Sequence, residues 1–263
     1  MRVGIITGSG TYALPGLEEQ GVESVATRFG DVDVTAGVLA GVEVLHVSRH
    51  LPGHARVSNH VTHQANMLAL ATREVDAVLA VTVCGSLDPE LAPGSLVVFD
   101  DLHFPSNRLP DGSICTLHTE PGTPGRGHWI FERPFSSALR CALLDGAREA
   151  GHEVRDGGCY GHVDGPRFNT RSEIRTLQQA GVSAVSQTAG PETVLAGEAG
   201  VPFALLGYAT DYANGVTPQP TPVEELMRNI DASGEVLAST LTAAVTRVDG
   251  GELAPVGSRF AWD

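Results

Sequence analysis

The chain has 263 residues, enough for one α/β domain, and carries a formal charge of −14 at pH 7. Binding to nucleic acid requires clustered basic side chains, and because none cluster here, the composition excludes a nucleic-acid partner. All 17 basic side chains are arginines, which excludes Schiff-base, pyridoxal-phosphate and P-loop chemistry, since each depends on a lysine amine.

No linker or change of composition divides the chain, so a single domain over residues 1–263 is predicted. The apolar start is too short for a signal sequence, and no stretch reaches membrane-spanning length. We therefore expect a cytoplasmic protein without a membrane partner. The wide spacing of the four cysteines predicts reduced thiols, no disulfide and no metal site. They are Cys84, Cys115, Cys141 and Cys159.

A short buried strand over residues 3–7 leads into the glycine turn Gly8-Ser-Gly-Thr11. Such a turn presents backbone N–H groups and the hydroxyl of Ser9 to an anion, although an ordinary tight turn is the alternative. The dinucleotide motif GxGxxG is incomplete, because Pro15 and Gly16 follow where a helix should run. No nicotinamide cofactor is expected.

A second strand over residues 41–47 leads to Arg49 and His50. The forked guanidinium of Arg49 fits a tetrahedral oxyanion, so we predict that Arg49 and the neighbouring imidazoles contact phosphate. The histidines of this region lack accompanying carboxylates and the HExxH spacing, which argues against a metal. A solvated loop accounts for His54 and His63.

The remaining chain alternates predicted helices and buried strands, the pattern of an α/β fold. Helices are predicted over residues 61–70, 136–151, 191–199 and 222–248 and from residue 171 onward; strands are predicted over 77–82, within 93–100, and over 182–187 and 201–208. The segment 104–127 is rich in Pro, Gly and Asn and is expected to be a long surface loop.

Three segments that follow strand-like runs hold the strongest ligand candidates: residues 160–171, 187–192 and 209–215. They contain an aromatic face at Phe168, backbone-rich turns and the carboxylate of Asp211. Open α/β sheets bind small molecules on the loops beyond the carboxyl ends of their strands. These segments therefore predict one small-molecule site at this edge of the sheet.

The motifs together resemble the trimeric purine nucleoside phosphorylases, most closely their 5'-methylthioadenosine phosphorylase branch. The matching residues are Gly8-Ser-Gly10, Arg49-His50, Cys84-Gly-Ser-Leu87, Pro93-Gly-Ser-Leu96, Asp164-Gly-Pro-Arg-Phe-Asn-Thr-Arg171, Thr188 with Pro191-Glu192, and Thr210-Asp-Tyr212. The resemblance covers nearly the whole chain. It implies a mixed α/β sheet partly closed into a barrel and flanked by helices, a homotrimer or a dimer of trimers, and cleavage of a nucleoside by inorganic phosphate without a cofactor.

The resemblance also implies residue roles. The residues expected at phosphate are Ser9, Arg49, His50, Thr82, Val83 and Thr188. Phe168 would pack on the purine, and Asp211 would be the acid that hydrogen-bonds N7 of the base. An exposed aspartate would be ionised near neutral pH and could not donate, so we predict a buried Asp211 with a raised pKa.

At the sugar, the resemblance places Gln187 under the ribose, where the family usually has methionine. His128 would reach the 5' site of a neighbouring subunit. Val223 and Leu226 would line that same 5' site, with packing in the core as their alternative.

Two residues give opposite indications of which purine the protein prefers. Asp211 favours a 6-aminopurine, because 6-oxopurine enzymes usually have asparagine there, but Ala213 replaces a second aspartate of the adenine-type pattern. Three functions stay open: a 5'-methylthioadenosine phosphorylase, a 6-oxopurine or methylthioinosine phosphorylase, and a nucleoside-binding protein that has lost catalysis.

Overall fold

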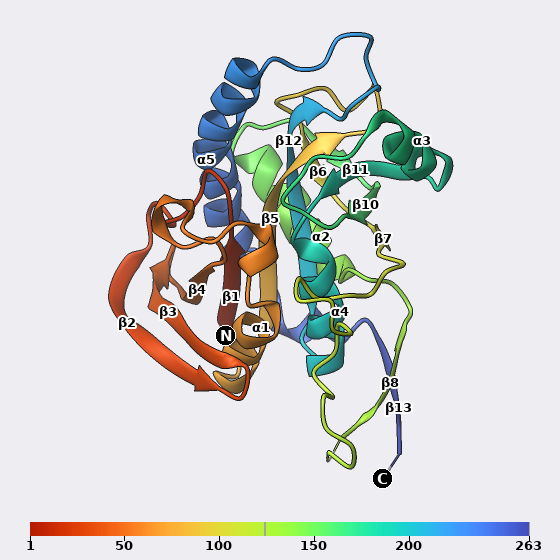
Figure 1. Ribbon diagram of the computed structural model, residues 1–263. Coiled ribbons are helices and arrows are strands. Elements are labelled where there is room, and N and C mark those ends of the chain that lie inside the picture. The colour runs from red at the N-terminus through yellow and green to blue at the C-terminus, as the bar shows by residue number, and fades with distance from the viewer. Residues whose placement is uncertain (124, 263) are drawn as a thin grey trace.

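The structure, a computed structural model, describes residues 1–123 and 125–262. Within them, eleven strands form one mixed sheet with helices packed against it (Figure 1). The strands are β1 (Arg2–Thr7), β2 (Glu18–Thr27), β3 (Gly30–Leu39), β4 (Val42–Ser48), β5 (Ala77–Ser86), β6 (Leu96–Val98), β7 (Asp101–His103), β9 (Val154–Asp156), β10 (Cys159–His162), β11 (Val182–Ser186) and β12 (Phe203–Tyr212). The α-helices are α1 (His63–Thr72), α2 (Ser137–Glu149), α3 (Arg171–Gln179), α4 (Ala189–Ala199) and α5 (Val223–Val245), and 3-10 turns are η1 (Pro52–His54), η2 (Ser58–His60) and η3 (Gly250–Glu252).

The sheet branches at β5. One part runs β2-β3-β4-β1-β5, with β1 parallel to both β4 and β5. On one side, β12 pairs parallel with β5 and antiparallel with β6, and β6 pairs parallel with β9. On the other side, β11 pairs antiparallel with the end of β5, and the sheet continues to β10 and β7. This order confirms the mixed α/β class. The predicted partial closure into a barrel stays a prediction, because among the described residues no ladder joins β7 to β9.

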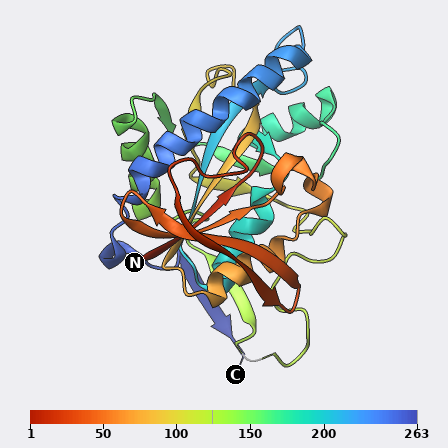
Figure 2. The same ribbon diagram turned by 90° about the vertical axis from the view of Figure 1, so that its left-hand side faces the viewer.

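Hydrophobic side chains cover both faces of the sheet. One core contains Met67 of α1 and Leu195 of α4, and the other contains Leu143 of α2 and Leu241 of α5. All four side chains are fully buried. Figure 2 shows the long α5 lying across the strands, with the β2–β3 hairpin on the near side. The strands are thus covered on both faces. Because β4, β1, β5 and β12 run parallel, their carboxyl ends lie at the same edge of the sheet.

The predicted helices and strands are confirmed, with boundaries shifted by a few residues, but two regions differ from expectation. The strands β5 and β12 run on to Ser86 and Tyr212, so part of the expected ligand loops is strand. Residues 104–123, within the expected surface loop, contain no helix or longer strand, but the side chains of Leu109, Cys115 and Leu117 are buried, so this part of the loop packs on the body of the protein.

A separate two-stranded ribbon joins β8 (Gly127–Phe131) and β13 (Gly257–Ala261) in antiparallel register. It lies beside the C-terminus in Figure 1. Its side chains Ile130 and Phe260 are about half exposed, at 55% and 52%. Among the described helices, none combines the length and the apolar character needed to cross a membrane.

Candidate functional site

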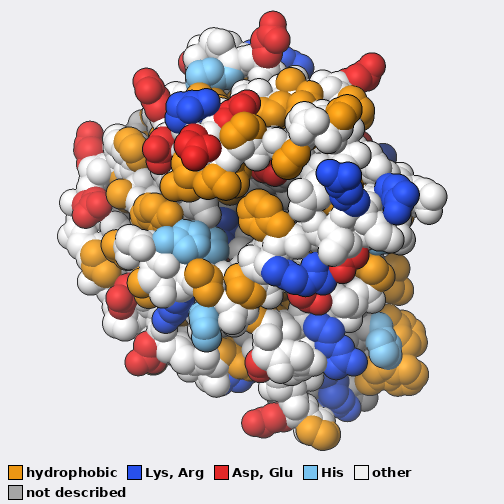
Figure 3. All heavy atoms as spheres, turned by 45° about the horizontal axis from the view of Figure 1, so that its top comes forward, with side chains coloured by type: hydrophobic (Ala, Val, Ile, Leu, Met, Phe, Trp, Pro, Cys, Tyr) orange, Lys and Arg blue, Asp and Glu red, His pale blue; other side chains and the backbone are white. Residues whose placement is uncertain are grey.

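A pocket of about 290 Å³ lies where β1, β4, β11 and β12 end, against the last residues of β5. Figure 3 views this end of the molecule, where hydrophobic side chains and a histidine border a hollow. The pocket brings together most of the residues predicted from the sequence. They are Ser9, Arg49, His50, Thr82, Val83, Phe168, Gln187, Thr188, Asp211 and Leu226.

Arg49 is fixed at one end of the pocket and is only 1% exposed. Its Nε and Nη2 each donate to a carboxylate oxygen of Glu192 at 2.7 Å, and its Nη1 donates to the carbonyl of Val81 at 2.7 Å. A Cβ at Gly8 would lie 2.5 Å from Nη1, so only glycine lets the turn after β1 approach so closely. The guanidinium is therefore held in one orientation, with its charge balanced by Glu192.

His50 beside Arg49 is held in one tautomer. Its Nδ1 lies 2.8 Å from the carbonyl of Arg56, and because a carbonyl only accepts, Nδ1 carries the proton. Burial, reinforced by the charge of Arg49, lowers the pKa of His50 to about 4. At neutral pH the ring is thus uncharged, with its Nε2 lone pair free to accept.

The expectation of a solvated loop is wrong for His63, whereas His54 is half-buried in the turn η1 and also contacts the pocket. His54 lines the pocket, where it stacks on His50 with ring centroids 4.3 Å apart and its Nδ1 lies 3.0 Å from the hydroxyl of Tyr12. His63 is 2% exposed, and its Nδ1 lies 3.7 Å from Oε1 of Glu192. Both imidazoles belong to the packed surroundings of the Arg49 end.

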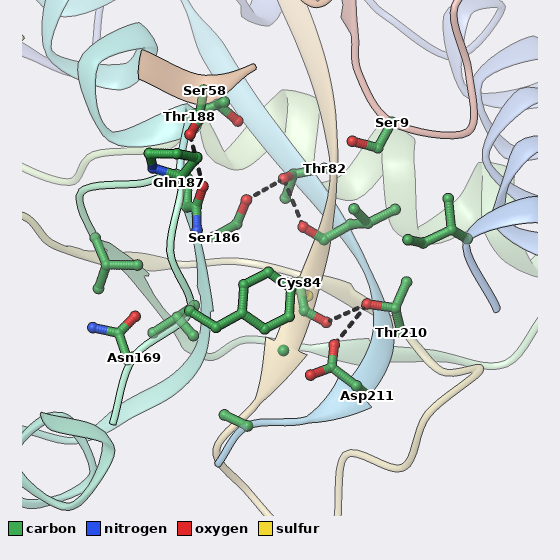
Figure 4. Close-up of a pocket in the computed structure, with 18 of the residues that line it drawn as sticks. Ser9, Ser58, Thr82, Cys84, Asn169, Ser186, Gln187, Thr188, Thr210 and Asp211 are labelled. Carbon is green, nitrogen blue, oxygen red and sulfur yellow. Dashed lines mark hydrogen bonds between the residues drawn. The ribbon is translucent and has the colours of Figure 1, made fainter. Parts of the chain in front are cut away.

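Hydroxyl groups and a helix terminus complete this end. Figure 4 shows Ser9, Thr82 and Ser186 near one another, with the Thr82 and Ser186 hydroxyls 2.8 Å apart. Thr188 immediately precedes α4 and is 3% exposed. The start of α4 carries the partial positive charge of a helix N-terminus, which favours an anion. The Arg49 end therefore gathers donors that an anion could accept from.

Asp211 lies towards the opposite end of the pocket in Figure 4. A register shift in β12 between Ala209 and Asp211 places it beside Gly85 of β5. Its Oδ1 accepts a hydrogen bond from the hydroxyl of Thr210 at 2.8 Å, and the residue is 9% exposed. Burial raises the pKa of Asp211, and the Thr210 bond opposes this only in part. The predicted burial and raised pKa are confirmed.

Of the residues predicted at the purine and at the 5' site, Phe168 and Leu226 line the pocket, whereas Val223 and His128 do not. Phe168 lines the pocket with 61% of its surface exposed, so its ring is open to a ligand. Leu226 of α5 lines the pocket, but Val223 lies outside it and is 68% exposed. His128 is exposed on β8, away from this pocket.

Several lining residues were not singled out from the sequence, among them Ser58, Ser186, Asn169, Ile174 and Ile230. Ser186 is the last residue of β11, so a search for hydroxyl groups at the ends of predicted strands could have found it. Ser58 lies in a 3-10 turn, and no local pattern marks it.

The pocket thus joins a donor-rich end at Arg49 to a buried acid, Asp211. That pairing suits a reaction in which an anion displaces a leaving group that the acid protonates. Within residues 1–123 and 125–262, no three His, Cys, Asp or Glu side chains are grouped to hold a metal ion.

The chain is similar in sequence and in fold to known phosphorylases. The sequence model of the Phosphorylase superfamily matches residues 2–246. A probable 6-oxopurine nucleoside phosphorylase from Moorella thermoacetica is 33% identical over 246 residues, covering 93% of this chain and 92% of that protein. An S-methyl-5'-thioadenosine phosphorylase from Geobacter sulfurreducens is 30% identical over 263 residues, covering 99% and 90%. The solved structure of methylthioadenosine phosphorylase from Schistosoma mansoni with adenine superposes with a TM-score of 0.85 at 27% identity, covering 94% and 91%.

Proposed function

Because the chain belongs to the phosphorylase superfamily, we propose that it cleaves the N-glycosidic bond of 5'-methylthioadenosine, or of a related 5'-modified purine nucleoside, with inorganic phosphate. The products are a free purine and a 5-modified ribose 1-phosphate. The observation that carries the proposal is one pocket with Arg49 at its anion-binding end and the buried Asp211 at the other.

In this reaction the anion-binding end holds phosphate beneath the sugar. Arg49, Ser9 and Thr188 supply donors from a charged fork and two hydroxyls, and the start of α4 adds a partial positive charge. The carboxylate of Glu192 already neutralises the charge of Arg49. Phosphate binding therefore depends more on the direction of the hydrogen-bond donors than on an excess of positive charge. The attacking oxygen is thereby held in place for displacement at the anomeric carbon.

Asp211 protonates the leaving base. As the glycosidic bond breaks, negative charge moves into the purine while the sugar gains oxocarbenium character, and a proton at N7 stabilises the departing base. The raised pKa keeps more of Asp211 in its donor form than an exposed aspartate would retain. Phe168, open to the pocket, would pack against the purine plane.

A 6-aminopurine fits the acid better than a 6-oxopurine. A neutral carboxyl offers one donor and one acceptor, which match N7 and the 6-amino group of adenine. The apolar side chains of Leu226 and Ile230 in the pocket suit a methylthio group at the 5' position.

A 6-oxopurine or methylthioinosine phosphorylase is the second candidate. It is supported by the relative named as a probable 6-oxopurine nucleoside phosphorylase, at 33% identity, and by Ala213, which offers no further acceptor to a 6-amino group.

We further propose that the chain forms a homotrimer, or a dimer of trimers, in the cytoplasm and acts in purine salvage. The half-exposed Ile130, Phe260 and Trp262 support self-association through the β8–β13 ribbon. His128 lies on that ribbon, so the same association would bring it to a neighbouring copy. A light-scattering mass of a single chain at working concentration would contradict this assembly.

The test of the function is a substrate panel. The purified protein is incubated with 5'-methylthioadenosine, adenosine, methylthioinosine and inosine, each with and without phosphate, and bases and sugar phosphates are quantified by chromatography. We expect phosphate-dependent release of adenine, fastest from 5'-methylthioadenosine. Preferred release of hypoxanthine would select the 6-oxopurine function. Tight nucleoside binding with no sugar phosphate at any phosphate concentration would identify a binding protein.

A further inference from the structure

Gln187 links two segments of the pocket wall. Its Nε2 donates to the carbonyl of Arg167 at 3.1 Å, and its Oε1 accepts from the hydroxyl of Ser58 at 2.7 Å. Because a carbonyl only accepts, the amide nitrogen must face Arg167, which leaves the amide oxygen for Ser58. Figure 4 shows the Ser58 to Gln187 bond at the edge of the pocket. The orientation of the amide is thus set by its two partners.

The linkage is closely packed. A Cβ at Gly165 would lie 2.0 Å from Oε1 of Gln187 and 2.1 Å from Oγ of Ser58, so any side chain there would push the two groups apart. Ser58 itself is 8% exposed. A buried hydroxyl without its partner would carry a desolvation cost, which favours the closed arrangement.

The segment tied down in this way carries Phe168. The carbonyl before it, at Arg167, accepts from Gln187, and the carbonyl after it, at Asn169, accepts from Nδ2 of Asn214 at 2.8 Å. The Arg167 side chain points to α3, where it pairs with Glu173 at 2.7 Å. Phe168, with 61% of its surface exposed, therefore depends on the main chain on either side for its position.

We propose that Gln187, oriented by Ser58, is a positioning residue. It holds the main chain of residues 167–169 so that the ring of Phe168 can pack against the purine. This role rests on the proposed function. It is distinct from a hydrogen bond between Gln187 and the sugar, because it acts through Phe168. Loosening the linkage lowers the affinity for the nucleoside, while the Arg49 end and the proton donor are unchanged.

The experiment is a double-mutant cycle on steady-state kinetics. Gln187→Leu, Phe168→Ala and the double variant are compared with the wild type, with KM measured separately for nucleoside and phosphate. Gln187→Leu removes both bonds of the amide. Loss of the bond that reaches the Arg167 carbonyl predicts a roughly 3- to 10-fold higher nucleoside KM, with kcat and phosphate KM within about 2-fold. In the Phe168→Ala background the same change should raise the nucleoside KM by less than about 2-fold.

Ser58→Ala should raise the nucleoside KM in the same direction but less, and add nothing in the Gln187→Leu background. Gln178→Leu is the matched control, because Gln178 also donates from its amide to a carbonyl, that of Leu87 at 2.9 Å, outside the pocket. It should leave both KM values unchanged. Thermal unfolding of each variant shows whether the fold is retained. Calorimetry with adenine then shows whether the variant has lost affinity for the base.

Two results would overturn the proposal. If Gln187→Leu weakens nucleoside binding equally with and without Phe168, Gln187 acts directly on the substrate. If it changes neither nucleoside KM nor adenine affinity, the linkage positions nothing. A wild type that binds adenine but never releases base with phosphate would instead reject the proposed function, and the cycle is then completed on adenine affinity alone.

Discussion

Replacing Glu192 by glutamine removes the counter-charge of a buried arginine. Glu192 and Arg49 are 0% and 1% exposed and share two hydrogen bonds of 2.7 Å. Removing one partner of such a pair costs about 3 to 5 kcal/mol, because the other charge stays buried. Glutamine keeps one acceptor, so we expect about 3 kcal/mol. For a chain of this size each kcal/mol shifts Tm by about 2 to 4 °C, which predicts a fall of about 6 to 12 °C.

Thermal unfolding at pH 7, followed by circular dichroism, measures this fall. The matched control is Glu43→Gln, which breaks the exposed pair between Glu43 and Arg2. An exposed pair contributes at most about 1 kcal/mol, so the control should lose no more than about 2 to 4 °C. If Glu192→Gln is no less stable than this control, the buried pair does not stabilise the fold and the reasoning fails.

The pH dependence provides a second check. Burial alone would raise the pKa of Glu192, but the charge of Arg49 and the hydrogen bonds outweigh it and lower the pKa to about 2. A depressed pKa means that the stabilisation is present above the ordinary value of 4.5 and is lost as pH falls towards 2. The difference in Tm between wild type and Glu192→Gln should therefore narrow as pH falls from about 5 to 3. A constant difference would contradict the assignment.

Three further predictions concern other parts of the molecule. Asp211→Asn should lower kcat by about 10²- to 10⁴-fold. Burial raises the pKa of Asp211, so ionisation of its carboxyl is unfavourable in the folded state. The wild type therefore loses stability as pH rises from 3.8 through the folded pKa, and Asp211→Asn should have the higher Tm at pH 7 but not below pH 3.8. Near wild-type turnover in Asp211→Asn would refute the catalytic role of Asp211. Gly8→Ala places a Cβ 2.5 Å from Nη1 of Arg49 and should raise the phosphate KM more than the nucleoside KM in steady-state assays, and equal effects on both would argue against a phosphate role for Arg49. Thr170→Ala breaks the capping box with Glu173 and should cost about 1 kcal/mol in urea unfolding, whereas no loss would show that α3 does not depend on its cap.

The elements that could be predicted are those with local signals. Ser136 caps α2, and Thr170 caps α3 with Glu173 returning the bond. Both motifs act within one turn, so the starts of these helices could be predicted from the sequence. The β2–β3 hairpin was not foreseen. Seven consecutive residues at the start of β2 are exposed, so its sequence lacks the alternation that marks a half-buried strand, and pairing with β3 holds it.

The site could be predicted only in part, because several of its contacts join residues that are far apart in the sequence. Strand-end rules and the family resemblance located Arg49 and Asp211. The partner of Gln187, Ser58, is 129 residues away, and the partner of Arg49, Glu192, is 143 residues away. No local pattern encodes such contacts, so the sequence suggested a solvated loop for His63, whereas tertiary packing buries it beside Glu192.

The pairing of β5 with β12 also fixes the order in which a growing chain can complete its pocket. Ala77–Ser86 is available early in synthesis, but its parallel partner Phe203–Tyr212 is made more than a hundred residues later. Until then β5, almost entirely buried in the finished protein, has an unpaired and apolar edge. A chain truncated before residue 203 therefore lacks the acid as well as the strand that covers this edge, and should aggregate instead of forming a partial site.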